Sequence, residues 1–186
     1  MPKSELILCI ETSSKLLSIA LWQDGVVLDD INHIGAKVHN EHLLPSIKKI
    51  LENSNFSLNN LTGIACGIGP GSFTGLRIGC AAIQGLAFSL NIPVYTCSSL
   101  RLIAQEYYLK NKNKNKNKIL IIQDANAGDF YLGKYIIKNN LAVSLDINLD
   151  INLDFSLCSD ILLNKKDVMD YINNNNFDAY IGDAAG

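Results

Sequence analysis

A glycine-rich loop is the first feature of the sequence that could bind a ligand. The stretch GIGPGSFTGLRIG runs from Gly67 to Gly79, and five of its thirteen residues are glycine. The stretch is not a P-loop, because it contains no lysine. It is not a dinucleotide-binding Gly-x-Gly-x-x-Gly motif either, because the position of the last glycine is taken by Ser72 or by Thr74, depending on the first glycine chosen. What remains is a tight turn before a packing helix, with anion binding at the helix N-terminus as the alternative. The predicted loop-turn residues are Gly69, Pro70, Gly71, Ser72 and Thr74, of which Ser72 or Thr74 is the expected N-cap.

Three other groups of side chains could take part in chemistry. His39 and His42 are three residues apart and could share a metal, but only Glu41 lies nearby as a third ligand. We interpret this segment as a solvated helix start and predict no metal site. Ser72 lacks the Gly-x-Ser-x-Gly elbow of a nucleophile, so peptidase chemistry is not expected. Asp124 ends an apolar run, either as a turn-forming residue or as an acid that faces a phosphate.

The composition indicates a folded globular protein. Hydrophobic residues make up 48% of the 186 residues and charged residues 18%, with a formal net charge of −2. This charge excludes a chain that is basic overall, although a local basic patch is compatible with it. The five cysteines form no Cys-x-x-Cys motif, which favours buried reduced thiols and a reducing compartment. Without a signal-peptide pattern or an apolar run of about 18 residues, we expect a cytoplasmic protein that spans no membrane.

The first half of the chain predicts a mixed sheet with helices. Apolar runs at 6–11, 18–22 and 26–34 indicate strands, and Asp24-Gly25 between the last two indicates a hairpin. Apolar residues at helical spacing then predict a helix around 43–52, with Pro45 near its first turn or at a kink. Further strands are expected at 63–68 and 92–96, on either side of a helix at 74–90.

The second half repeats the pattern of the first. After KNKNKNKNK at 110–118, which we interpret as a mobile, solvated connection between lobes, an apolar run again ends in an acid at 119–125. Contact of these lysines with phosphates is the alternative. Strands are expected at 129–137 and 141–155, where residues 145–155 alternate with period two, and a helix around 165–173. The predicted organisation is an N-terminal lobe (1–109), a linker (110–118) and a second lobe (119–186) that is cut short.

The helix predicted at 74–90 is apolar on two sides. One side is expected to contact its own sheet, and the other, made mostly of small residues, the first helix or another subunit. The sheet side is Leu76, Cys80, Ile83 and Ala87, and the small side is Ile78, Ala82, Gly85 and Ser89. The predicted partner interface is Leu43, Ile47, Ile50 and Leu51 from the first helix and Phe73, Ile78, Ala81, Ala82, Gly85 and Ser89 from the second.

These residues resemble the signature of the TsaB (YeaZ) family. The match is carried by the stretch from Gly67 to Gly79 and QGLA at 84–87, with support from IETSS at 10–14 and HNEHLLPSI at 39–47. DANAGDFY at 124–131 is similar to a family motif, but Asn126 replaces its Arg and Asp129 its Glu, which puts contacts of that loop in doubt. The family also continues for several dozen residues beyond GDAAG.

The resemblance implies an α/β fold of the actin/Hsp70/sugar-kinase type, with two related lobes. It implies a noncatalytic subunit that pairs with TsaD, which transfers a threonylcarbamoyl group to the adenosine beside the anticodon of tRNA. The ATPase TsaE would join them, and without TsaD the subunit would form a homodimer through the same helices. ATP and a metal ion would be used through these partners, and tRNA would be met in the complex.

The same resemblance suggests where a nucleotide cleft would once have been. Kinases of this fold hold metal-phosphate with an Asp and a Gly-Thr turn after the first strand, whereas this turn reads Glu11-Thr12-Ser13-Ser14 and lacks the glycine. The residues of this vestigial cleft would be Glu11, Thr12, Ser13 and Asp124. The alternative function is a small ATP-dependent phosphotransferase of the same fold, and a third is an α/β dimer of other purpose.

Overall fold

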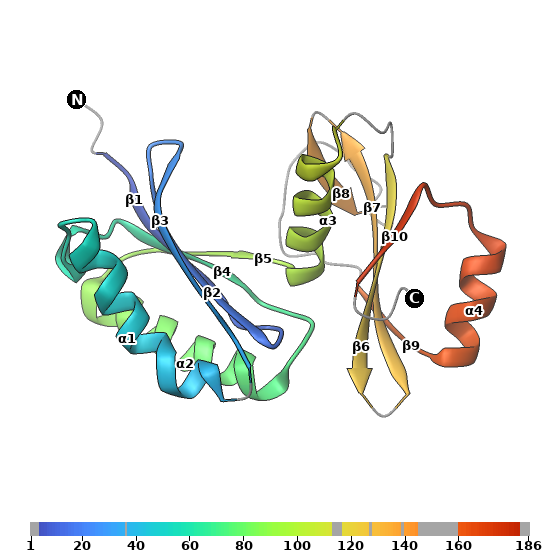
Figure 1. The fold of residues 1–186 in the computed structure, drawn as a ribbon, viewed down its shortest axis with the longest axis horizontal. Helices are drawn as coiled ribbons and strands as arrows, with labels where there is room; N and C mark the ends of the chain where they lie inside the picture. Colours follow the sequence, from blue (N-terminus) through green and yellow to red (C-terminus); the bar gives the residue numbers. More distant parts are fainter. Residues whose placement is uncertain are drawn as a thin grey trace. The chain divides into compact units, whose positions relative to one another are not determined.

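The chain divides into two compact units in a computed structural model. The structure describes residues 4–35, 37–112, 117–126, 128–138, 140–144 and 160–182. The first unit is Met1–Cys97 and the second is Ser98–Gly186, and each is described by itself (Figure 1). The boundary predicted at 109–119 is therefore wrong. The reason is an unpredicted helix, α3 (Ser99–Lys110), which buries its apolar side in the second unit.

The first unit contains a five-stranded sheet in the order β3-β2-β1-β4-β5. The first three strands form an antiparallel meander, and β4 and β5 continue the sheet in parallel with β1. Asp24 and Gly25 turn the predicted hairpin with positive φ values of 47° and 96°. The elements are β1 (Leu6–Glu11), β2 (Leu16–Gln23), β3 (Val26–Ile34), α1 (Val38–Asn53), a 3-10 turn (Leu58–Asn60), β4 (Gly63–Gly67), α2 (Phe73–Leu90) and β5 (Val94–Cys97).

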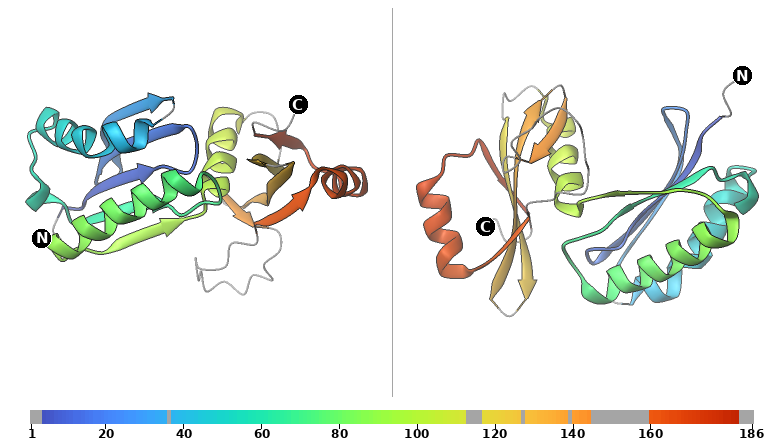
Figure 2. Two further views of the ribbon diagram at one scale, coloured as in Figure 1. Left: turned by 90° about the horizontal axis from the view of Figure 1, so that it is seen from below. Right: turned by 180° about the vertical axis from the view of Figure 1, so that it is seen from behind.

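Helices α1 and α2 lie on the same face of this sheet (Figure 2). Leu8 and Ile10 of β1 and Ile19 of β2 point to that face, because Leu8 pairs with Leu21 and Ile10 with Ile19 in the register. These side chains are almost completely buried. Pro45 lies in the interior of α1, which continues through it. The predicted strands and helices of this half are therefore confirmed, except that α1 begins earlier.

The second unit repeats the order of the first. β6, β7 and β8 form an antiparallel meander, α4 follows, and β10 returns parallel to β6, as β4 does to β1. β9 pairs with the first half of β7 and β8 with its second half. The elements are β6 (Lys118–Asn126), β7 (Asp129–Lys138), β8 (Leu141–Ser144), β9 (Ile161–Asn164), α4 (Lys165–Asn174) and β10 (Ala179–Ile181). The whole alternating segment at 145–155 and residues 113–116 of the Lys/Asn segment lie outside the described residues.

Helices α3 and α4 cover opposite faces of the second sheet. Ile119 and Ile121 of β6 pack with α3, whereas Leu120 and Ile122 pack with α4. This alternation is that of a strand buried on both faces. The Lys/Asn segment therefore connects α3 to β6 within one unit, and the chain passes between the units at Cys97–Ser98.

A polar cluster fixes the start of α3 inside the second unit. The Asp160 carboxylate accepts hydrogen bonds from the Ser98 hydroxyl (2.6 Å) and the Tyr135 hydroxyl (2.8 Å). Ser98 also caps α3 by accepting from the Arg101 amide, and both hydroxyl-bearing residues are almost fully buried. The two hydroxyls also lie 3.3 Å from each other, so the carboxylate is the charged acceptor of a cluster that fixes the start of α3.

We predict that Asp160→Ala lowers the free energy of unfolding of the second unit by about 1–3 kcal/mol, since two buried hydroxyls lose their charged acceptor. Asp170→Ala, at an exposed position of α4, is the control. Hydrogen exchange should show lost protection in 98–142 and unchanged protection in 4–97. Equal protection in the two variants would show that the cluster contributes no stability.

Candidate functional site

The glycines of the opening stretch allow α2 to lie against the turn that follows β1. A Cβ atom at Gly75 would come within 2.2 Å of the Thr12 carbonyl oxygen, and one at Gly79 within 2.4 Å of the Thr12 hydroxyl. A Cβ at Gly71, which has a φ of 157°, would come within 2.1 Å of the Ser13 carbonyl oxygen. No side chain fits in these spaces. The structure therefore gives the glycines a packing role, and this favours the turn-and-helix interpretation.

Backbone hydrogen bonds hold the same contact. The Ser72 amide donates to the Ser13 carbonyl (2.5 Å), and the Ser72 hydroxyl caps α2 by accepting from the Gly75 amide (3.2 Å). Ser72, rather than Thr74, is the N-cap. The loop glycine Gly69 takes a φ of 90°, as the predicted tight turn requires. The amide and hydroxyl of the cap are thus engaged within the chain.

The predicted cleft residues of the first unit are covered by this contact. Thr12 and Ser13 are 3% and 4% exposed. The Glu11 carboxylate accepts a hydrogen bond from the Ser13 amide (2.7 Å), which closes the turn locally. Asp124 is exposed near the end of β6 in the second unit. The vestigial cleft itself stays a prediction, because its residues belong to two separately described units.

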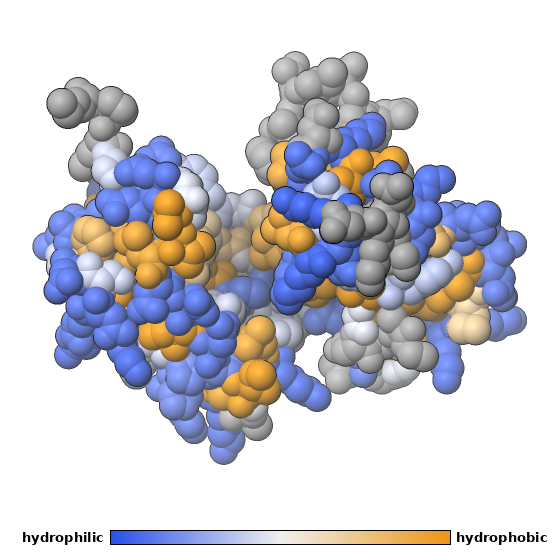
Figure 3. All heavy atoms as spheres, turned by 45° about the horizontal axis from the view of Figure 1, so that its top comes forward, coloured by the Kyte–Doolittle hydropathy of each residue, from blue (hydrophilic) through white to orange (hydrophobic). Residues whose placement is uncertain are grey.

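The opposite side of α2 is exposed and carries apolar residues among polar ones such as Arg77 and Gln84. Phe73 is 67% exposed and Phe88 is 92% exposed, and the Arg77 guanidinium lies 3.9 Å from the centre of the Phe73 ring. Ala81 and Gly85 are exposed between them, and a Cβ at Gly85 would meet nothing within 4 Å. We name Phe73, Ala81, Gly85 and Phe88 the apolar face of α2. Figure 3 shows apolar side chains reaching the surface of the first unit among hydrophilic ones.

The structure corrects part of the predicted partner interface. Ile78 and Ala82 are half-buried against the core of their own unit, so the exposed side of α2 is turned away from them. Phe73, Ala81, Gly85 and Ser89 are exposed as an interface requires. The four residues proposed from α1 form the core instead and are at most 3% exposed: Leu43, Ile47, Ile50 and Leu51. Sequence reasoning missed Phe88, which a helical wheel centred on Phe73 would have found.

The histidines near α1 pack against each other. The rings of His33 and His42 are stacked with centroids 4.4 Å apart, and His33 Nε2 lies 2.9 Å from the Ser46 hydroxyl. His39 is 8% exposed, so the expectation that it lies in a solvated helix start is wrong. In the part of the chain that is described, no group of three or more His, Cys, Asp or Glu residues is arranged to hold a metal ion.

The thiols of the first unit differ in exposure. Burial raises the pKa of the Cys66 thiol to about 11, and the nearby Glu11 carboxylate and Cys80 thiol add to this shift. Burial also raises the pKa of the Cys9 thiol. Cys80 is exposed on α2, so the expectation that the thiols are buried fails there. Cys80 is consequently the accessible thiol on α2, close to its apolar face.

By length and composition, α2 would suffice to cross a membrane. The expectation that the chain spans no membrane stays a prediction. The contacts of α2 with Thr12 and with the core of its unit are those of a helix packed on a sheet. A core helix of a water-soluble protein passes the same test, so this criterion alone is weak.

Comparisons with known proteins agree on one family. A family model described as "TsaD: tRNA N6-adenosine threonylcarbamoyltransferase" matches residues 31–150. The tRNA threonylcarbamoyladenosine biosynthesis protein TsaB of Buchnera aphidicola (subsp. Schizaphis graminum) is 37% identical over 138 residues, 74% of this chain and 64% of that protein. Escherichia coli TsaB is 37% identical over 129 residues, 69% of this chain and 54% of that protein. The chain thus matches about half to two thirds of the length of these relatives.

A solved structure shows the same fold. YeaZ from Pseudomonas aeruginosa superposes with a TM-score of 0.72 and 28% sequence identity, over 86% of this chain and 68% of that one. The two mixed sheets with their helices, and the strand order that recurs in the second unit, are consistent with this superposition. The predicted α/β fold with mixed sheets and helices is confirmed, and it is the fold of YeaZ.

We predict that Gly75→Ala destabilises the first unit by about 1–3 kcal/mol, because the added methyl group would overlap the Thr12 carbonyl. Gly85→Ala is the matched control on the same helix. Its methyl group meets open space, and it should stabilise α2 by somewhat under about 1 kcal/mol. Urea unfolding followed by the fluorescence of Trp22, the single tryptophan, measures both. Equal stability of the two variants would contradict the packing role of Gly75.

Proposed function

The chain belongs to the TsaB (YeaZ) family, and from this membership we propose that it acts as a noncatalytic partner subunit of TsaD in threonylcarbamoyladenosine biosynthesis in tRNA. The names of the curated relatives and the family model over residues 31–150 support this pathway. The observation that carries the subunit role is the apolar face of α2, which the described residues leave uncovered.

The apolar face of α2 suits helix-to-helix association. Phe73 and Phe88 lie near the two ends of the helix, and each aromatic ring would contribute about 1.5–3 kcal/mol if fully buried by a partner. Ala81 and Gly85 between them are small, so a second helix backbone can approach closely. The proposed occupant is TsaD, and a second copy of this chain when TsaD is absent.

The turn after β1 supports a noncatalytic role for this subunit. Its side chains are covered by α2, and its residues lack the glycine that lets a phosphate approach a backbone. We therefore assign threonylcarbamoyl transfer to TsaD, and the use of ATP and a metal ion to TsaD and TsaE. tRNA would be engaged by the assembled complex, in the cytoplasm.

Gly85→Arg should abolish association with TsaD and leave the subunit folded. The position is open, so the long side chain can reach water in the free subunit. In the complex it would fill the space of a close backbone approach and bury a poorly paired charge, which costs several kcal/mol. Since 1.4 kcal/mol is tenfold, we expect a loss of at least about 100-fold in affinity. Size-exclusion chromatography and calorimetry with purified TsaD measure it.

Asn59→Arg is the control for this experiment, since it adds the same side chain at an exposed position of the 3-10 turn, outside α2. Thermal melting establishes that both variants fold. A folded Gly85→Arg variant with unchanged affinity would place the interface on another surface.

The isolated subunit should not turn over ATP. The covered turn after β1 and the absence of a lysine from Gly67 to Gly79 leave this unit without the phosphate-binding groups of a P-loop or kinase turn. Phosphate release with ATP and Mg²⁺ is the assay. Steady turnover of about 1 per second or faster would favour the phosphotransferase of the same fold instead.

A further inference from the structure

The topology of the second unit gathers four lysines at one end of its sheet. Helix α3 ends at Lys110 and is followed by Lys112, β6 begins at Lys118, and β7 ends at Lys138. β6 and β7 are antiparallel, so the start of one lies beside the end of the other. The Ile137 amide donates to the Asn117 carbonyl (2.8 Å), which extends this pairing to the last residues. We name these four lysines the basic end.

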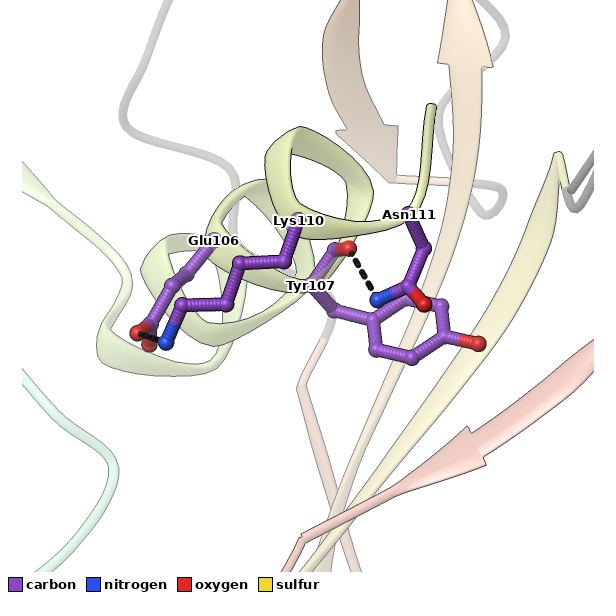
Figure 4. Close-up of polar contacts among 4 residues, drawn as sticks. All are labelled: Glu106, Tyr107, Lys110 and Asn111. Carbon is purple, nitrogen blue, oxygen red and sulfur yellow. Dashed lines mark hydrogen bonds and ion pairs between the residues drawn. The ribbon is translucent and has the colours of Figure 1, made fainter. Parts of the chain in front are cut away.

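Hydrogen bonds hold the end of α3 against the same end of the sheet. The Tyr108 hydroxyl donates to the Asn140 side-chain oxygen (2.7 Å), and the Gln105 amide donates to the Asn140 carbonyl (3.0 Å). The Asn111 side chain donates to the Tyr107 carbonyl (2.9 Å) and closes the last turn of α3 (Figure 4). These bonds fix the end of α3 beside the end of β7, so Lys110 and Lys138, which are distant in sequence, lie at the same end of the sheet.

The positive charge of the basic end is only partly compensated. Lys110 pairs with Glu106 one turn earlier on the exposed side of α3 (Figure 4). The Asp178 carboxylate accepts hydrogen bonds from the Asn117 and Lys118 amides (2.9 and 2.8 Å).

Three ammonium groups are left to solvent at this end. Within the described residues, the side chains of Lys112, Lys118 and Lys138 are exposed and make no hydrogen bond or ion pair. Asp124 and Asp129 lie at the opposite end of the same two strands, where Asp124 pairs with Phe130 and Asp129 pairs with Asn126. The charge of the whole chain is slightly negative, so this local excess is a property of one end of one sheet.

We propose that the basic end binds the phosphate backbone of RNA, which in this pathway is the tRNA substrate. The proposal rests on the proposed function for the identity of the RNA. Exposed lysines act as mobile point charges that neutralise phosphates and release counterions, and they read no base sequence. Tyr107 and Tyr108 are partly buried against the core, so their rings are not free platforms for base stacking. The contact is therefore electrostatic, sensitive to salt and independent of sequence.

The test is the double variant Lys118→Gln/Lys138→Gln in the full chain. Binding of a fluorescent, unmodified tRNA transcript is followed by anisotropy between about 50 and 200 mM salt, the range over which phosphate contacts weaken strongly. Loss of two phosphate contacts should make the plot of log K against log salt shallower by about 1.5 and weaken binding at the lowest salt by about tenfold. Melting temperatures establish that the variant folds.

The matched control is Lys165→Gln/Lys166→Gln, which removes the same charge from exposed positions at the start of α4. Asn164, the preceding residue, pairs with Asp129, so these lysines lie at the other end of β7. This control should bind tRNA as the unchanged chain does. Equal losses in the two double variants, an unchanged salt slope, or no tRNA binding by the unchanged chain at the lowest salt would overturn the proposal.

A separate measurement without tRNA keeps the two proposals apart. Association of the unchanged chain with purified TsaD tests the proposed function alone, and its failure would leave the salt dependence of RNA binding standing as an independent result. The Lys118→Gln/Lys138→Gln variant should bind TsaD normally. A loss of TsaD binding in this variant would mean that the basic end contacts an acidic protein surface, which contradicts an RNA site.

Discussion

The close approach of α2 to the turn after β1 is the constraint on which the first unit depends. Three glycines of the loop and helix leave room only for the backbone and side chains of Thr12 and Ser13, and the Ser72 amide bonds the Ser13 carbonyl. The contact covers the turn that follows β1, where Thr12 and Ser13 are almost fully buried. One packing requirement thus accounts for both the glycine-rich sequence and the burial of this turn.

The same contact determines what α2 presents to its surroundings. Gly75 and Gly79 lie against Thr12, and Ile83 lies in the core of the unit. These contacts fix the rotation of α2 about its own axis. In this orientation Phe73, Ala81 and Phe88 are exposed or face away from the core. A rigidly seated helix offers a partner a preorganised surface, which reduces the entropy lost on association. One side of α2 therefore packs in the first unit, and the other side is the surface that the proposed function assigns to a partner.

Local patterns predicted the elements, and long-range packing decided the rest. The Asp24-Gly25 hairpin, the repeat of strands and the extent of α2 follow from turn residues and periodicity. Which face of α2 is exposed depends on the clash of a Cβ with Thr12, more than sixty residues earlier in the sequence, and no local pattern reports it. The predicted boundary between the units is wrong because the Lys/Asn segment has the composition of a linker. The packing of α3 decides the boundary instead, since the buried Leu100 and the hydrogen bond of Ser98 hold this helix in the second unit.

The accessible thiol of α2 permits the most direct test of the account. Cys80 is exposed on this helix, whereas burial holds the Cys66 thiol in its unreactive protonated form near neutral pH. Alkylation at about pH 8, resolved by peptide mass spectrometry with and without purified TsaD, should show fast labelling of Cys80 in the free subunit, slow labelling of Cys66, and protection of Cys80 in the complex. A complex in which Cys80 is labelled as fast as in the free subunit would contradict the assignment of α2 as the partner-binding helix.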